Sequence, residues 1–102
     1  GDEKDLNILE QSILSSSAQW REYGLVYLGR YAIYHNPDLS IQAIDVLIRT
    51  HNENQELQSR CIYVLNYLND YWSEQIERTE VKAEKKEFEE RLDYLKKKVS
   101  QL

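Results

Sequence analysis

The sequence predicts an all-α protein, with a small antiparallel, repeat-like bundle of three or four helices followed by a long C-terminal helix. Three observations predict this fold class. Residues 36–47 recur in modified form as residues 54–65. Glycine occurs three times and proline once, so few residues favour the turns that strands need. Apolar residues recur every three or four positions through most of the chain.

The internal repeat has a period of 18 residues and preserves the order of its apolar positions. The matched pairs are Asn36 and Asn54, Asp38 and Glu56, Leu39 and Leu57, Ala43 and Cys61, Ile44 and Ile62, Val46 and Val64, and Leu47 and Leu65. Self-similarity of this kind is typical of stacked helices, none of which can bury its apolar face alone.

The first predicted helix runs from about Asp5 to Leu14, with Leu6, Leu9 and Ile13 at helical spacing. Asp5 can cap its beginning, and three serines at 15–17 end it.

The second predicted helix runs to about Tyr34. Ser16 and Gln19 have the spacing of a capping box at its beginning.

The third predicted helix runs from Pro37 to about Thr50, after a break at residues 35–38. Its polar side is a narrow stripe made of Asp38, Gln42, Asp45 and Arg49. A helix that is apolar over most of its circumference has neighbours on two sides, so we expect this one at the centre.

The fourth predicted helix follows a polar break at residues 51–54, where Asn52 or Asn54 can cap it. Its core-facing residues are Leu57, Cys61, Val64, Leu65, Leu68 and Trp72. No residue that would end a helix follows, so we expect that this fourth helix can continue straight into the tail.

Two regions are therefore predicted: a helical body at 1–72 and a charged amphipathic helix at 73–102. In the second region 16 of 30 residues are charged. Apolar residues fit alternating steps of four and three there, as in a coiled coil: Val81, Phe88, Leu92, Leu95, Val99 and Leu102. Isolated helices are marginal in water, so this one needs a second copy of itself or the body to pack against. We expect homo-oligomerisation through these six residues.

Charge is unevenly distributed and argues against nucleic acid as a partner. Residues 1–72 carry ten acidic and five basic side chains, whereas residues 73–102 carry eight of each. An acidic body repels phosphate backbones. The basic run Lys96–Lys98 is better explained as compensation of a helix dipole. No apolar run approaches the roughly 20 residues needed to span a bilayer.

Aromatic residues form two helical series that are candidate partner-binding residues. The first series is Trp20, Tyr23, Tyr27, Tyr31 and Tyr34, and the second is Tyr63, Tyr67 and Tyr71. Packing between helices with hydroxyl groups at the rim is the favoured interpretation of the series as a whole, because the other sides of the second helix also carry apolar residues that need cover. Some of these side chains must still face solvent, and those are the candidates for binding a partner, since tyrosine and tryptophan are enriched in protein interfaces.

No pattern predicts catalysis, a cofactor or a metal. His35, His51 and Cys61 lack metal-ligand spacing, and cationic capping of helix ends explains both histidines. Residues 15–17 are serines in a turn without a companion base. We therefore predict that the protein is not an enzyme and takes no cofactor.

The segment from Ser17 to Leu68 resembles HEAT and armadillo-type helical repeats. The resemblance rests on the repeated pattern above and a looser copy that begins at residues 17–20. A weaker similarity to tetratricopeptide repeats rests on Leu28-Gly29 and Ala43. Both resemblances imply a binding scaffold without catalytic residues.

The sequence thus favours a non-enzymatic protein–protein interaction or assembly module. Two alternatives remain at this point: the soluble domain of a bacterial envelope lipoprotein, and a small-molecule sensor with an aromatic pocket. The cellular compartment stays open, with the cytoplasm slightly favoured and the envelope possible.

Overall fold

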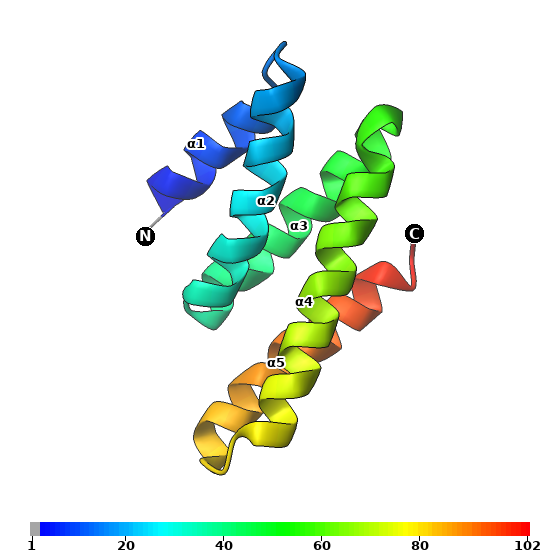
Figure 1. Ribbon diagram of the computed structural model, residues 1–102. Coiled ribbons are helices and arrows are strands. Elements are labelled where there is room, and N and C mark those ends of the chain that lie inside the picture. The colour runs from blue at the N-terminus through cyan, green and yellow to red at the C-terminus, as the bar shows by residue number, and fades with distance from the viewer. Residues whose placement is uncertain (1–2) are drawn as a thin grey trace.

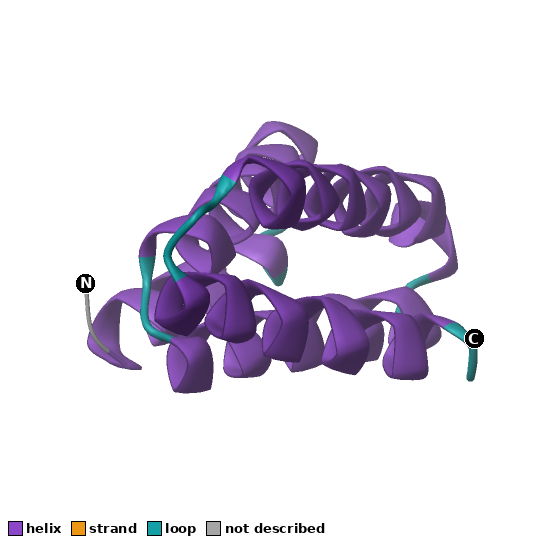
Figure 2. Ribbon diagram, turned by 90° about the horizontal axis from the view of Figure 1, so that it is seen from below, coloured by secondary structure: helices purple, strands orange, loops and turns teal. Residues whose placement is uncertain are grey.

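Five α-helices make up nearly all of residues 3–102. The computed structural model describes residues 3–102, and this part contains no strand (Figures 1 and 2). The helices are α1 (Glu3–Ile13), α2 (Ala18–Tyr34), α3 (Pro37–Glu53), α4 (Gln58–Arg78) and α5 (Lys82–Val99), with a 3₁₀ turn, η1 (Gln55–Leu57), before α4. The prediction of an all-α fold is confirmed.

Capping side chains set the beginnings of α2 and α3. The hydroxyl of Ser17, and not that of Ser16 as the sequence suggested, accepts the backbone N–H of the third residue of α2 at 3.5 Å. Asn36 accepts the N–H of Leu39 at 3.0 Å, with proline in the first turn of α3. Asn54 acts differently from the expectation. Its amide donates to the carbonyl of Thr50 at 3.2 Å and so caps the end of α3.

The helices lie in two layers, with α2 and α4 in one layer and α1, α3 and α5 in the other (Figures 1 and 2). Helix α3 contacts each of the other four helices. Its central place explains why its apolar residues cover most of its circumference. The central position expected for this segment is thus observed.

Two glycines let neighbouring helices approach α2 closely. A Cβ atom at Gly24 would lie 2.9 Å from Cγ1 of Ile13 and 3.2 Å from its backbone nitrogen. At Gly29, a Cβ atom would lie 2.9 Å from Cγ1 of Val64. These distances are shorter than ordinary van der Waals contacts, so α1 and α4 pack against α2 at the two positions where a glycine of α2 has no side chain.

The last helix does not extend away from the body. Residues 79–81 interrupt the helix, and α5 returns along α4 and α3 (Figure 1). The Cα radius of gyration is 13.4 Å, close to the roughly 13 Å of a compact domain of 100 residues. Straight continuation of the fourth helix into the tail is therefore wrong: Leu92 and Leu95 are buried with the body's apolar residues. The division proposed between residues 72 and 73 falls inside α4.

A buried arginine links α5 to the end of α2. Arg91 is 6% exposed; its Nη2 donates to the carbonyl of His35 at 3.1 Å, and its Nε donates to the hydroxyl of Ser40 at 3.3 Å. That hydroxyl donates to the carbonyl of Ala32 at 2.5 Å. Burial lowers the pKa of Arg91, and the charges of two nearby glutamates act in the opposite direction. The cation therefore lies where the C-terminal carbonyls of α2 concentrate negative partial charge.

A tyrosine provides a second link, between α5 and α3. The hydroxyl of Tyr94 donates to Oδ1 of Asp45 at 2.5 Å. Burial, and then the hydrogen bond and charge of Asp45, raise the pKa of Tyr94 to about 12.

We expect Tyr94→Phe to lower the free energy of unfolding at pH 7 by about 1 kcal/mol, because one hydrogen bond to a charged group is lost. A raised pKa stabilises the fold fully below the unfolded value of about 10, and this contribution disappears as pH rises through about 12. The difference between wild type and Tyr94→Phe should therefore shrink between pH 10 and 12 in urea titrations. Tyr34→Phe, at a residue that is 79% exposed, should change the free energy of unfolding at pH 7 by less than about 0.5 kcal/mol. A difference in the free energy of unfolding between wild type and Tyr94→Phe that stays constant from pH 10 to pH 12 would contradict the hydrogen bond assigned between Tyr94 and Asp45.

Candidate protein-binding surface

An exposed row of aromatic side chains runs along α2. Four members, here called the aromatic ridge, are exposed: Trp20 (60%), Tyr23 (45%), Tyr27 (50%) and Tyr34 (79%). They follow one another at three-, four- and seven-residue steps, which keeps them on one side of a helix. The opposite side of α2 carries Leu25, Leu28 and Ala32, which are fully buried.

Neighbouring side chains hold the ridge in place. The rings of Trp20 and Tyr23 meet edge to face with centroids 6.1 Å apart, and Gln19 donates to the Tyr23 hydroxyl at 3.1 Å. The guanidinium of Arg30 lies 5.6 Å from the centroid of the Tyr27 ring. Aromatic side chains restrained in this way lose less conformational entropy on binding than free ones.

Tyr31, the fifth aromatic residue of this series, is buried. It is 5% exposed, and its ring stacks on His35 with centroids 3.8 Å apart. The Nδ1 atom of His35 lies 2.8 Å from the carbonyl of Tyr31, so this histidine sits at the end of α2 as expected. Tyr31 therefore belongs to the packing of α2, unlike its four neighbours.

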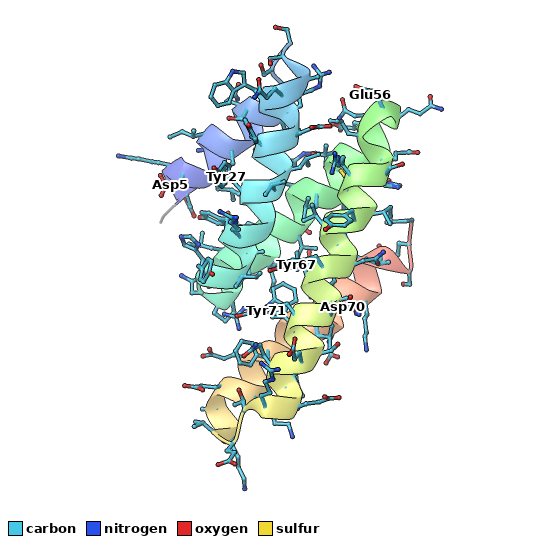
Figure 3. All side chains as sticks on the ribbon, viewed as in Figure 1. Asp5, Tyr27, Glu56, Tyr67, Asp70 and Tyr71 are labelled. Atoms are coloured by element: carbon cyan, nitrogen blue, oxygen red, sulfur yellow. The ribbon has the colours of Figure 1, made fainter. Side chains whose placement is uncertain are left out.

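The second aromatic series lies on α4. Tyr63 is 66% exposed and Tyr67 50%, whereas Tyr71 is half-buried. The rings of Tyr67 and Tyr71 stack with centroids 6.5 Å apart. Figure 3 labels both tyrosines, together with Tyr27 across on α2.

A groove of about 360 Å³ separates the two aromatic series. It is lined by Val26, Gly29 and Arg30 of α2 and by Arg60, Tyr63, Val64 and Tyr67 of α4. Both charged side chains of the lining are arginines, in a protein whose net charge is −5. Arg60 lies 3.5 Å from a carboxylate oxygen of Glu22, with about half of each side chain exposed.

The ridge continues onto α1 through Ile8, which no sequence pattern had singled out. Ile8 is 63% exposed and borders two shallow hollows, one of about 360 Å³ that includes Tyr27 and Tyr34 and one of about 420 Å³ that includes Trp20. Its exposure could have been read from the sequence. Leu6, Leu9 and Ile13 form the apolar face of α1, and Ile8 lies off that face.

The six residues predicted to mediate oligomerisation occupy different environments. Leu92 is 7% and Leu95 1% exposed, and both belong to the core. Phe88 and Val99 are half-buried against the core. Only Val81 and Leu102 are exposed among the six. The buried pair is available to a second copy only if α5 leaves the body.

Residues considered for chemistry are dispersed. Cys61 is fully buried, and burial raises the pKa of its thiol to about 11. Within residues 3–102, no three His, Cys, Asp or Glu side chains are grouped so as to hold a metal ion. None of the helices in the same range combines the length and the apolar character that crossing a bilayer demands.

No protein-family model, curated protein or solved structure matches this chain.

Proposed function

We propose that this protein is a non-enzymatic protein–protein interaction module whose contact surface is the aromatic ridge with its flanking groove. The observation that carries the proposal is the exposure of aromatic side chains on two adjacent helices, α2 and α4. Exposed apolar patches on a soluble domain mark interaction sites, and tyrosine and tryptophan dominate the binding energy of interfaces.

The two-layer arrangement supports this proposal and the resemblance to helical repeats. In α-solenoid proteins, helix pairs stack into layers and one layer presents a continuous binding surface. Here the exposed aromatic side chains of α2 and α4 supply such a surface, and the arginines of the groove add positive charge to it.

The groove is less suited to a small molecule than to a side chain of another protein. Small-molecule sites enclose roughly 70–90% of their ligand. Half or more of the Tyr63 and Tyr67 side chains faces solvent, so a ligand in the groove would stay wet on one side. A protein partner covers such side chains with its own surface.

The test is capture of binding proteins on the full chain, followed by titration of the purified partner. Trp20→Ala, Tyr27→Ala and Tyr34→Ala should each fold normally because these side chains are exposed. We expect at least one of them to raise Kd by about 30-fold, the effect of losing a 2 kcal/mol hot spot. Lys86→Ala and Glu89→Ala, at exposed positions of α5, should leave Kd unchanged.

Equal affinity of the partner for wild type and all three ridge variants would refute the proposed surface. Deleting residues 73–102 is not a suitable test, because it would remove Leu92 and Leu95 from the core.

A further inference from the structure

The exposed side of α4 carries a row of side chains that is complementary to itself. This row, the α4 stripe, consists of Arg60, Tyr63, Tyr67, Asp70 and Glu74, at steps of three, four, three and four residues. All five are exposed, so they occupy one side of the helix while Cys61, Leu65 and Leu68 are buried on the other. Tyr67 and Asp70 are labelled in Figure 3.

Charge along the α4 stripe changes sign about its centre. Arg60 lies seven residues before Tyr67 and Glu74 lies seven residues after it. At 1.5 Å per residue, each charge is about 10 Å from the level of Tyr67 along the helix axis. If a second α4 packs antiparallel across Tyr67, Arg60 of each copy meets Glu74 of the other. Tyr63 then meets the region of Asp70, whose carboxylate can accept its hydroxyl.

We propose that this chain self-associates through the α4 stripe as a two-fold symmetric, antiparallel pair centred on Tyr67. A two-fold interface requires a surface that is complementary to itself, and the stripe has this property. The aromatic ridge does not, because it has no acidic member. Self-association through α5, expected from the heptad pattern, would need Leu92 and Leu95 to leave the core.

Charged neighbours within the chain leave both ends of the stripe accessible. Arg60 faces Glu22 of α2 at 3.5 Å, and Glu74 faces Arg78 of the next turn at 2.5 Å. Arg60 keeps 53% and Glu74 51% of the side chain exposed in these pairs. Exposed pairs contribute about 0–1 kcal/mol, so they do not prevent a contact with a second copy.

Charge reversal tests the partner and the register together, by sedimentation velocity over a concentration series of the full chain. Arg60→Glu and Glu74→Arg should each raise the dimer dissociation constant at least about tenfold, because like charges then face each other twice. The double variant Arg60→Glu/Glu74→Arg should dimerise like wild type. An equimolar mixture of the two single variants should form a heterodimer, since every facing pair is again of opposite charge.

Two exposed positions of α5 provide matched controls. Lys86→Glu and Glu89→Arg change the net charge by the same amounts, and both should leave the dissociation constant unchanged. Circular dichroism should show the same helix content for all variants. In the mixture, each single variant keeps its altered pairing with Glu22 or Arg78 within its own chain, and only the charges that face each other between chains change. Recovery of a dimer on mixing therefore reports on the contact between copies.

A wild type that stays monomeric at millimolar concentration would overturn the inference. So would a dimer that the single variants leave intact, or single variants that fail to associate on mixing. Arg60, Tyr63 and Tyr67 belong both to the α4 stripe and to the groove, so a dimer would compete with a partner for the groove. The aromatic ridge of α2 is separate from the stripe, and its partner binding is measured with α2 variants. The two proposals can therefore fail separately.

Discussion

Replacing Leu95 with Asp is expected to unfold most of the protein, and not merely to separate two copies of it. Leu95 is 1% exposed and packs within the common core, where a carboxylate has no partner to compensate its loss of water. Burying an unpaired charge and losing a large apolar side chain together cost more than about 4 kcal/mol. A small domain has only about 5–15 kcal/mol of stability in total. Circular dichroism and urea unfolding would measure the loss.

Two other positions of the same heptad pattern serve as controls. Val81 is 55% and Leu102 42% exposed, so an aspartate at either position should change the free energy of unfolding by less than about 1 kcal/mol. A coiled-coil seam between two copies would instead make these positions and Leu95 equivalent. If Leu95→Asp kept full helicity and only halved the mass, the tail would be an oligomerisation element and its packing on the body would be wrong.

Truncating Arg91 to alanine is expected to lower the free energy of unfolding by about 2–4 kcal/mol. The change leaves the carbonyl of His35 without its guanidinium donor and removes a buried aliphatic stem. Arg91→Lys should recover part of the loss, because an ammonium keeps the charge near the end of α2 but cannot reproduce the fork of the guanidinium. Chemical denaturation at pH 7 gives these differences directly.

Arg78→Ala is the matched control for this prediction. Arg78 is a largely exposed arginine in an i,i+4 pair with Glu74, so its loss should cost less than about 0.5 kcal/mol. Equal effects of Arg78→Ala and Arg91→Ala would show that the buried arginine does not secure α5 to α2.

Several parts of the candidate surface could be predicted from the sequence. Spacing places Trp20, Tyr23, Tyr27 and Tyr34 on one side of a helix, and the structure exposes all four. Spacing also included Tyr31 in this series, although its side chain is 5% exposed and its ring stacks on His35. Periodicity gives the direction of a side chain from its own helix, but not the width of the surface that a neighbouring helix covers.

Apolar spacing and capping residues were enough to predict an all-α chain and the approximate beginnings of its first four helices, but not the break at residues 79–81 before α5. Local chemistry suffices for this, because apolar period, caps such as Asn36 and the proline that follows it act within a single helix. The heptad pattern also predicted one apolar side for the charged region at 73–102. What covers that side depends on how the whole chain packs. The apolar residues of a heptad pattern can be buried by a second copy of the same helix or by other helices of the same chain, here α3 and α4. Three features hold α5 against the body: the turn at residues 79–81, the hydrogen bond from Arg91 to the end of α2, and the hydrogen bond from Tyr94 to Asp45.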